Sequence, residues 1–413
     1  MGVKWNRLRK NYYMARQIIT GIDIGSFQTK VVIAEHTFDQ GHFAPRIIGT
    51  GVSDSRGVER GYVTHAAEAA ISVKTAVARA EKMAGIRVKR AYVSFGGIGL
   101  GSVVSSGTIA ISRADLEVTE HDLDLALEVA EAAIPKATSL NKKIINTIPV
   151  EWKIDGKPAW GAVVGLKAQK LEVKALFITC LEHHLSELIK TVEEAGVEVA
   201  DVVAAPVAAS FVTVSKKQRR VGCLFADIGA ETLSILVFEN NNIVSLEVFP
   251  IGGSDITNDI ALGLKMGLDD AENVKLGGFS RTTYAKKKLD EIIFARLEDC
   301  FELIHVHLKK LGRDALLPAG IILTGGSAAT QHIKELSEEV LSLPSQVAEI
   351  HFGSNEKNKI KETIWATACG LSLLGFNADN EQSLIGRRNG PLTAADGKDL
   401  FQKASRWISQ LLP

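Results

Sequence analysis

The chain has 413 residues, of which 46% are hydrophobic and 23% charged, and its formal net charge is zero. These values suit a soluble protein of two or more globular domains and argue against a general nucleic-acid binder, which would carry a basic excess. The cysteines lie far apart without a CxxC pair, which disfavours zinc sites, redox chemistry and a disulfide scaffold and fits a reducing cytoplasm. They are Cys180, Cys223, Cys300 and Cys369.

The N-terminal part of the chain alternates expected strands with one long helix. Residues 1–17 form a basic extension without the apolar core of a secretory signal. A strand pair is expected at 18–35, and an amphipathic helix at 64–84 ends at Gly85. The uncharged stretch 91–112 is too rich in Gly and Ser for a membrane span and predicts strands. Its GGIGLG run is not expected to bind phosphate, because no helix follows it.

The rest of the body continues this alternation. A helix with Thr119 as its N-cap is expected to stop at Pro135. Further strands are expected at 143–153, 170–180, 221–250 and 319–324, and further helices at 181–195, 255–265, 285–311 and 362–376. The alternation predicts an α/β architecture.

Two stretches of the chain look like copies of one sequence motif. GIDIGSFQTKVVIAE at 21–35 and FADIGAETLSILVFE at 225–239 align without a gap at an offset of 204 residues. Each copy predicts a strand that ends near an Asp, a turn on Gly and a second apolar strand. Gly lets backbone N–H groups approach an anion closely, and Asp can hold a metal ion through water. Two such hairpins could grip a nucleotide polyphosphate from both sides, whereas a single copy would more simply be an ordinary turn.

Three further motifs match the two hairpins. Gly252 and Gly253 precede a helix whose N-terminus suits an anion. ILTGGS at 322–327 predicts a strand that runs into a glycine turn, on which a base or ribose can lie against bare backbone. Glu272 and Lys275 share one helix face, where they could bracket a ribose and a base or form an ordinary solvated pair.

Together these motifs resemble the actin-like ATPase superfamily, which includes actin, hexokinase and the Hsp70 chaperones, and more closely the bacterial cell-division family FtsA. The similarity extends over about residues 17–376 and again at the C-terminus. It is carried by DIGSFQTK at 23–30, AYVSFGG at 91–97, ADIGAETLSILVF at 226–238, IGGSDITNDIALGL at 251–264, AENVK at 271–275 and LPAGIILTGGS at 317–327. The resemblance implies an actin-like (ribonuclease H-like) two-lobed α/β fold with an inserted subdomain and a C-terminal amphipathic helix.

The resemblance also implies a domain organisation in which each lobe is assembled from separate segments. The first lobe comprises subdomain 1A at 18–90, about 173–205 and 362–376, together with the inserted subdomain 1C at 91–172. The second lobe comprises subdomain 2A at 206–264 and about 317–361, together with subdomain 2B at 265–316. Residues 377–398 are polar and predict a linker, and 399–413 would form a membrane-targeting helix.

By the same resemblance the chain would bind ATP with Mg²⁺. Asp23 and Asp227 would hold the metal ion, through water, and they are also weak candidates for catalytic residues. The residues implied to lie near the phosphates are Asp23, Gly25, Ser26, Gln28, Lys30, Asp227, Gly229, Thr232, Gly252 and Gly253. The residues implied to flank the adenosine are Glu272, Lys275, Gly325, Gly326 and Ser327.

Some positions depart from the family pattern in ways that bear on hydrolysis. Ala230 and Glu231 replace glycines of the second hairpin, Ser234 replaces an acidic residue, and Glu231 would repel a triphosphate unless it points away or meets Mg²⁺. Many relatives place Glu or Gln before the proline of the connecting helix, where it can orient a water molecule. This chain has Ala205 before Pro206, so we expect ATP binding with at most weak ATPase activity.

The C-terminal segment has the pattern of an amphipathic helix. Its apolar residues recur at the spacing of one helical stripe, and cations lie on the polar side, which suits the lipid headgroup zone. The residues expected to meet lipid are Leu400, Phe401, Lys403, Arg406, Trp407, Ile408, Leu411 and Leu412. The segment is too short to span a bilayer, and docking on the protein body or in a partner's groove is the alternative.

The resemblance implies a scaffold that polymerises, tethers the ring of the tubulin-like protein FtsZ to the cytoplasmic membrane and recruits later division proteins. The FtsZ C-terminal peptide would dock on 265–316, later division proteins would dock on 91–172, and the C-terminal helix would bind lipids at the division site. One alternative is a type IV pilus assembly module like PilM, which predicts no lipid binding by the tail. A less favoured alternative is a sugar or acid kinase, which needs a general-base Asp in a substrate pocket.

Overall fold

The computed structural model describes residues 17–39, 42–278, 286–353 and 362–384. The C-terminal segment with its apolar stripe therefore lies outside the described residues, as does the N-terminal extension up to residue 16. In the described part of the chain, no helix combines the length and apolar character that crossing a bilayer requires.

The first lobe is built on a five-stranded sheet of order β11-β6-β1-β2-β3. Strands β1, β2 and β3 are antiparallel, whereas β6 and β11 run parallel to β1. The strands are β1 Ile18–Ile24, β2 Gln28–Asp39, β3 His42–Asp54, β6 Arg90–Phe95 and β11 Glu198–Ala204. A small two-stranded sheet follows β3 and consists of β4 Val58–Glu59 and β5 Tyr62–Val63.

The second lobe repeats this sheet with the same order and the same strand directions, β14-β13-β12-β15-β16. Its strands are β12 Cys223–Ile228, β13 Leu233–Glu239, β14 Asn242–Phe249, β15 Ile321–Thr324 and β16 Ser345–Val347. The hairpin registers also coincide, because Asp23 lies opposite Lys30 and Asp227 lies opposite Ser234. The prediction that the two hairpins are copies is therefore confirmed by topology and register.

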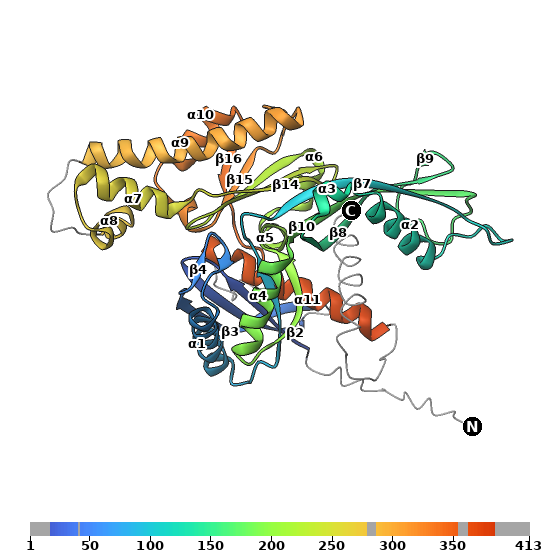
Figure 1. The fold of residues 1–413 in the computed structure, drawn as a ribbon, viewed down its shortest axis with the longest axis horizontal. Helices are drawn as coiled ribbons and strands as arrows, with labels where there is room; N and C mark the ends of the chain where they lie inside the picture. Colours follow the sequence, from blue (N-terminus) through green and yellow to red (C-terminus); the bar gives the residue numbers. More distant parts are fainter. Residues whose placement is uncertain (1–16, 40–41, 279–285, 354–361, 385–413) are drawn as a thin grey trace, which may run out of the picture.

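Helices cover both sheets and fill the space between them. In the first lobe these are α1 Ala66–Ala84, α4 Glu182–Glu194, α5 Ala205–Thr213 and α11 Ala366–Leu384. Helix α1 ends at Gly85 in the left-handed conformation, as expected. Helices α5 and α11 lie between the two lobes (Figure 1), where a single buried core joins Ile22, Ala208, Phe225 and Leu371.

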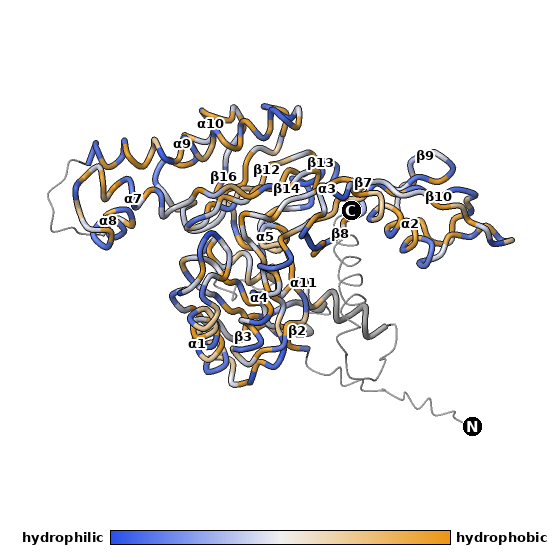
Figure 2. Tube along the Cα trace, viewed as in Figure 1, coloured by the Kyte–Doolittle hydropathy of each residue, from blue (hydrophilic) through white to orange (hydrophobic). Residues whose placement is uncertain are grey.

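The outer face of the second sheet is covered by a second layer of helices. These are α7 Gly253–Leu264, α8 Leu268–Lys275, α9 Lys286–Leu311 and α10 Ile333–Leu341, and a short α6 spans Lys216–Val221. Hydrophobic and hydrophilic residues alternate along α9 (Figure 2), and its apolar stripe packs on the sheet. The strands β11 and β16 and the helices α6 and α10 were not predicted from the sequence.

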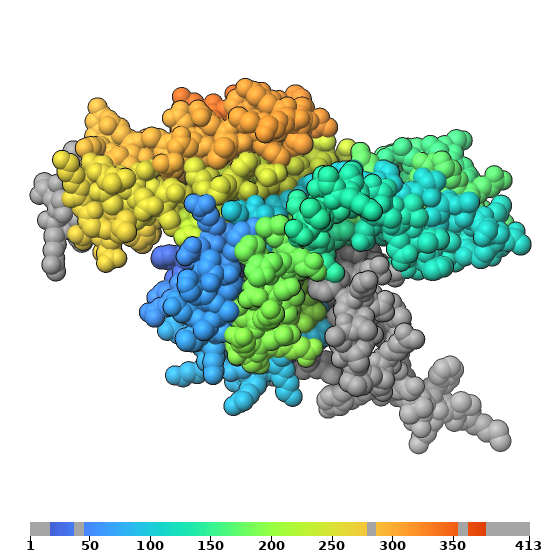
Figure 3. Space-filling model, in the orientation of Figure 1, coloured from blue at the N-terminus to red at the C-terminus, as the bar shows by residue number. Residues whose placement is uncertain are grey.

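A third unit lies at the opposite end of the molecule from α7 and α8 (Figures 1 and 3). Its sheet, of order β7-β10-β8-β9, comprises β7 Gly101–Ala110, β8 Lys142–Ile154, β9 Lys157–Pro158 and β10 Lys170–Leu181. Its helices are α2 Glu120–Ala132 and α3 Lys136–Ser139. The strands predicted for the uncharged stretch 91–112 are confirmed as β6 and β7.

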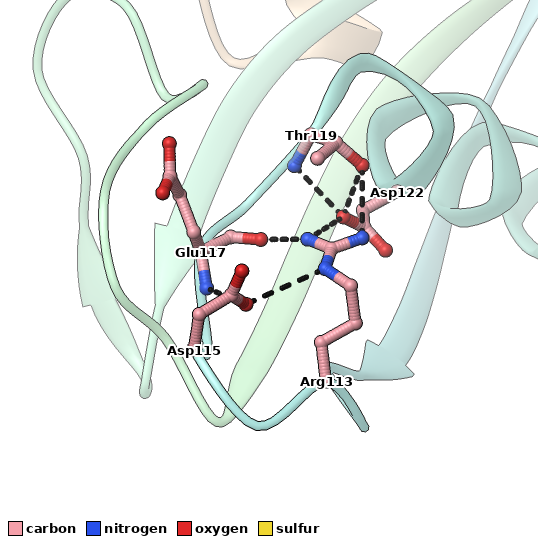
Figure 4. A network of polar contacts seen from close by, with 5 residues as sticks. All are labelled: Arg113, Asp115, Glu117, Thr119 and Asp122. Carbon is pink, nitrogen blue, oxygen red and sulfur yellow. Dashed lines mark hydrogen bonds and ion pairs between the residues drawn. The ribbon is translucent and has the colours of Figure 1, made fainter.

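The start of α2 is fixed by a polar network (Figure 4). Thr119 is the N-cap, as predicted, and its N–H donates to the Asp122 carboxylate at 2.8 Å. Arg113 donates to the same carboxylate at 3.0 Å and also to the Glu117 carbonyl. The network ties the loop that leaves β7 to the first turn of α2.

One expected helix end is confirmed and another was wrong. Helix α2 ends at Ala132 with Ala133 as its C-cap, and Pro135 follows two residues later, just before α3. Helix α11 continues past Phe376 to Leu384, into the segment expected to be a linker. That stretch is polar but contains neither Gly nor Pro, so its backbone hydrogen bonding can continue.

Candidate nucleotide site

The first hairpin presents a tight glycine turn with charged residues on either side. The N–H of Gly25 donates to the Gln28 carbonyl at 3.2 Å and closes the turn between β1 and β2. Asp23 lies opposite Lys30 in the ladder, and its Oδ1 accepts a hydrogen bond of 2.8 Å from the Ser94 hydroxyl. Burial raises the pKa of Asp23, while Lys30 and Ser94 act in the opposite direction.

The second hairpin repeats this turn and brings a second carboxylate to the same place. The N–H of Gly229 donates to the Thr232 carbonyl at 2.9 Å. The pKa of Asp227 is raised to about 7 by burial and by the neighbouring carboxylate of Asp23, and Lys30 partly offsets this rise. The two lobes therefore bring both aspartates and one lysine together, as the two-hairpin prediction required.

The glycine pair before α7 packs directly on the second hairpin. The N–H of Gly253 donates to the Gly229 carbonyl at 2.9 Å, and the N–H of Ser254 donates to the Ala230 carbonyl at 2.7 Å. The N–H of Gly252 donates to the Asp255 carboxylate at 2.8 Å, which caps the helix start. A Cβ built on Gly252 would lie 2.6 Å from the Ala230 carbonyl oxygen, so a larger residue would open this contact.

The turn after β15 closes the group from a third side. The Ser327 hydroxyl donates to the Gly229 carbonyl at 3.5 Å, and a Cβ on Gly325 would lie 2.4 Å from Asp227 Oδ1. A Cβ on Gly326 would meet nothing nearer than Ile364 Cγ2 at 4.0 Å, which leaves bare backbone at this point. The turn thus supports Asp227 on one side and presents an open peptide surface on the other.

Glu272 and Lys275 are joined to the glycine pair and are not a solvated surface pair. The side chain of Lys275 is 15% exposed, and its Nζ donates to the Gly253 carbonyl at 2.9 Å and to Thr257 Oγ1 at 2.8 Å. Glu272 Oε2 lies 2.7 Å from Lys275 Nζ and accepts a 2.5 Å hydrogen bond from the Thr257 hydroxyl. Helix α8 is thereby fixed to the first turn of α7.

The residues that depart from the family pattern occupy defined positions. Glu231 points across to the first lobe, where its Oε2 accepts a hydrogen bond of 2.5 Å from the N–H of Arg60. Ser234 is buried on β13 opposite Asp227. Ala205 begins α5 next to the end of β6, since a Cβ on Gly96 would lie 3.3 Å from its methyl group.

Four residues of this group were not predicted from the sequence. Ser94 orients Asp23 from the neighbouring strand, Thr257 connects Glu272 with Lys275, and the N–H groups of Arg60 and Gly61 bond to the two hairpins. The only available signal for Ser94 was its place at the end of a strand that follows the first hairpin. The other contacts join segments whose approach the sequence does not reveal.

The two hairpins supply a sparse set of donors for a cation. No cluster of three or more His, Cys, Asp or Glu ligands occurs in the described part of the chain. Two carboxylates with raised pKa values lie together, next to two glycine turns. A magnesium ion that retains water ligands and binds phosphate oxygens fits such a sparse set.

Comparison with known proteins identifies the family of this chain. A family model of the cell division protein FtsA matches residues 224–370, and a model of the SHS2 domain inserted in FtsA matches residues 97–179. The FtsA of Bacillus subtilis is 30% identical over 353 residues, which cover 80% of this chain and 78% of that protein. The chain belongs to the FtsA family.

Other FtsA proteins and solved structures agree with this assignment. FtsA of Pseudomonas aeruginosa is 26% identical over 415 residues, covering 95% of this chain and 97% of that protein. The PilM–PilN type IV pilus biogenesis complex matches with a TM-score of 0.63 at 17% identity, covering 86% of this chain and 98% of that chain. MreB5 of Spiroplasma citri bound to ADP matches with a TM-score of 0.50 at 13% identity, covering 90% and 99%. These structures show an actin-like fold, whereas family membership rests on the FtsA relatives.

Proposed function

We propose that this FtsA-family chain is an ATP- and Mg²⁺-binding scaffold that polymerises, tethers the FtsZ ring to the inner face of the cytoplasmic membrane and recruits later division proteins. The observation that carries the nucleotide part is the meeting of Asp23 and Asp227 at two matched glycine turns. The solved structure of MreB5 with ADP, a protein of similar fold, supports the hypothesis of nucleotide binding.

The residues of the two hairpins and the neighbouring turns fit the nucleotide. Asp23 and Asp227 would hold Mg²⁺ through water, and their raised pKa values would fall beside a cation. Gly25 and Gly229 would let the two turns approach the phosphates closely, and Lys30 would bind the phosphates. The backbone at Gly252, Gly253, Gly325 and Gly326, together with Ser26, Gln28, Thr232, Glu272, Lys275 and Ser327, would complete the site. Mg²⁺ would neutralise phosphate charge there.

Slow hydrolysis follows from Ala205, whose methyl group cannot orient a water molecule. We expect Ala205→Gln to raise the steady-state ATPase rate at least tenfold, since positioned general-base residues contribute about 10²–10⁴-fold. Ala205→Met adds similar length without a polar group and is the matched control. Equal rates in both variants and the parent chain would show that another feature limits turnover.

Attachment to the membrane would come from the C-terminal segment. A single amphipathic helix of this kind binds lipid on the scale of one acyl chain, roughly 10⁴ M⁻¹. Firm attachment then requires many copies side by side, which ties membrane binding to polymerisation. For the FtsZ peptide, exposed apolar side chains at Leu268 and Leu276 on the 265–316 segment support a docking surface.

Co-sedimentation with anionic liposomes in ATP and Mg²⁺ tests this function. We expect residues 1–413 to pellet with lipid several-fold more than residues 1–398, and Trp407→Glu to behave like the shorter chain. Lys403→Arg, which keeps the charge, is the control and should pellet like the full chain. Equal pelleting of the full and shortened chains would remove the anchor and favour a pilus-type binding module.

A further inference from the structure

The short turn between β4 and β5 bonds to both phosphate hairpins. Arg60 and Gly61 occupy left-handed conformations, with φ values of +50° and +74°. The N–H of Arg60 donates to Glu231 Oε2 of the second hairpin at 2.5 Å, and the N–H of Gly61 donates to Ser26 Oγ of the first hairpin at 3.0 Å. Two successive peptide groups therefore connect to opposite lobes.

The same turn packs on the GGIGLG run at 96–101. The N–H of Ile98 donates to the Arg60 carbonyl at 3.3 Å. A Cβ on Gly97 would lie 2.2 Å from Tyr62 Cε1, and a Cβ on Gly99 would lie 2.3 Å from Tyr62 Oη. The absence of side chains at these glycines is what makes room for the tyrosine ring.

The other side of the Tyr62 ring is stacked on the imidazole of His184. The ring centroids lie 3.7 Å apart and the planes differ by 10°. His184 Nδ1 is buried without a hydrogen-bond partner among the described residues. Tyr62 and His184 therefore interact through their ring faces, and such stacking requires close alignment of the two planes.

These two neighbours of Tyr62 are the chain crossings into and out of the inserted unit. The glycine run joins β6 to β7, where the unit begins, and His184 lies in the first turn of α4, directly after β10 leaves it. The unit also bonds to the second lobe, because the Leu246 N–H donates to the Ser102 hydroxyl at 3.0 Å. A shift of Tyr62 would thus act where the unit is joined to the first lobe.

The two hairpin contacts of the turn respond differently to an anion. A hydroxyl can accept a hydrogen bond from Gly61 and still donate its own proton to a phosphate oxygen, so Ser26 can retain its contact. The Glu231 carboxylate has no proton to donate, and a polyphosphate beside it would repel it. An anionic ligand would therefore keep one contact of the turn and weaken the other.

We propose that the Arg60–Tyr62 turn is a relay that transmits nucleotide occupancy to the two chain crossings of the inserted unit. The relay rests on the nucleotide binding proposed above. Bound nucleotide displaces Glu231 from the Arg60 N–H, the turn pivots on the Ser26 contact, and Tyr62 moves against Gly97, Gly99 and His184. The orientation of the inserted unit then depends on the nucleotide.

Hydrogen–deuterium exchange on the full chain, with and without Mg²⁺–ATP, tests the relay. Nucleotide affinity is measured separately with a fluorescent ATP analogue, so that saturation is known. We expect saturation to raise exchange at the Arg60 amide at least threefold and to change exchange over 96–101. Tyr62→Ala should keep nucleotide affinity within threefold and the response at Arg60 but lose the response over 96–101.

Conservative variants separate the relay from simple loss of packing. Tyr62→Phe keeps the stacked ring and should respond like the parent chain, and His183→Ala, at the exposed neighbour of His184, should do the same. Glu231→Gln removes the charge that a phosphate repels and should abolish the response at Arg60 without disturbing the core.

The outcomes distinguish the relay from the function on which it rests. Nucleotide binding without an exchange change over 96–101 overturns the relay alone, and so does an unaltered response in Tyr62→Ala. If that variant does not fold, a response at Arg60 in Glu231→Gln equal to that of the parent chain overturns the relay instead. Failure of the parent chain to bind nucleotide overturns the proposed function, and the relay with it.

Discussion

Replacing Asp227 with asparagine is expected to weaken Mg²⁺–ATP binding by about 100-fold and to stabilise the nucleotide-free protein at pH 8. A loss of that size, roughly 2.7 kcal/mol, is what removal of a charged partner in a partly buried site costs. The gain in stability has a different source. Asp227 carries its charge beside Asp23 in a partly buried setting, and this electrostatic repulsion in the nucleotide-free protein ends when the charge is removed.

The raised pKa of Asp227 makes the stability of the folded chain depend on pH. The pKa of Asp227 is raised from 3.8 to about 7 in the folded chain. Between these values the folded state holds a proton that the unfolded state has released, so stability falls as pH rises through the window. Above about pH 7 the loss is complete. The stability gain of Asp227→Asn should therefore be larger at pH 8 than at pH 5.5, when thermal unfolding is measured at both.

A matched control lies outside the nucleotide site. Asp201 on β11 also has its pKa raised to about 7 by burial, and it accepts a 2.8 Å hydrogen bond from the N–H of Val202. Asp201→Asn should show a similar stability gain at pH 8 with nucleotide affinity unchanged. Equal losses of affinity in both variants, or a destabilised Asp227→Asn at pH 8, would contradict this account of the paired aspartates.

Replacing Gly325 with alanine is expected to lower the free energy of unfolding by about 3–5 kcal/mol. Its φ of +90° and ψ of 177° lie in a region that is essentially restricted to glycine. A Cβ there would also lie 2.4 Å from Asp227 Oδ1 and 2.5 Å from the Ile228 carbonyl oxygen. Both are held in the sheet, so the backbone must move, and Asp227 moves with it. Chemical denaturation measures the loss.

The adjacent glycine provides the control for this substitution. Gly326 has an ordinary φ, and a Cβ there would meet nothing closer than 4.0 Å. Gly326→Ala should change stability by less than about 1 kcal/mol. It should nevertheless weaken ATP binding if the adenosine lies on this bare backbone. A stable Gly325→Ala protein would contradict the steric account of this turn, and a Gly326→Ala protein with full affinity would place the adenosine elsewhere.

The sequence by itself determined the local devices of this protein. The matched Asp-x-Gly hairpins follow from a strand–turn–strand pattern within fifteen residues, and their identical register follows from the same offset of 204. Helix ends at Gly85 and Thr119 were readable because caps act within one turn. The end of α11 was not readable, because polar composition alone does not stop a helix.

Only the tertiary structure decided how these local motifs contact one another. The contact of Glu231 with the Arg60 N–H joins positions 171 residues apart, and Ser94 reaches Asp23 across 71. The raised pKa of Asp227 needs burial and Asp23 together, and the glycines at 97 and 99 leave room for the ring of Tyr62. Such contacts depend on the packing of two lobes around a shared core, and no local pattern in the chain encodes that approach.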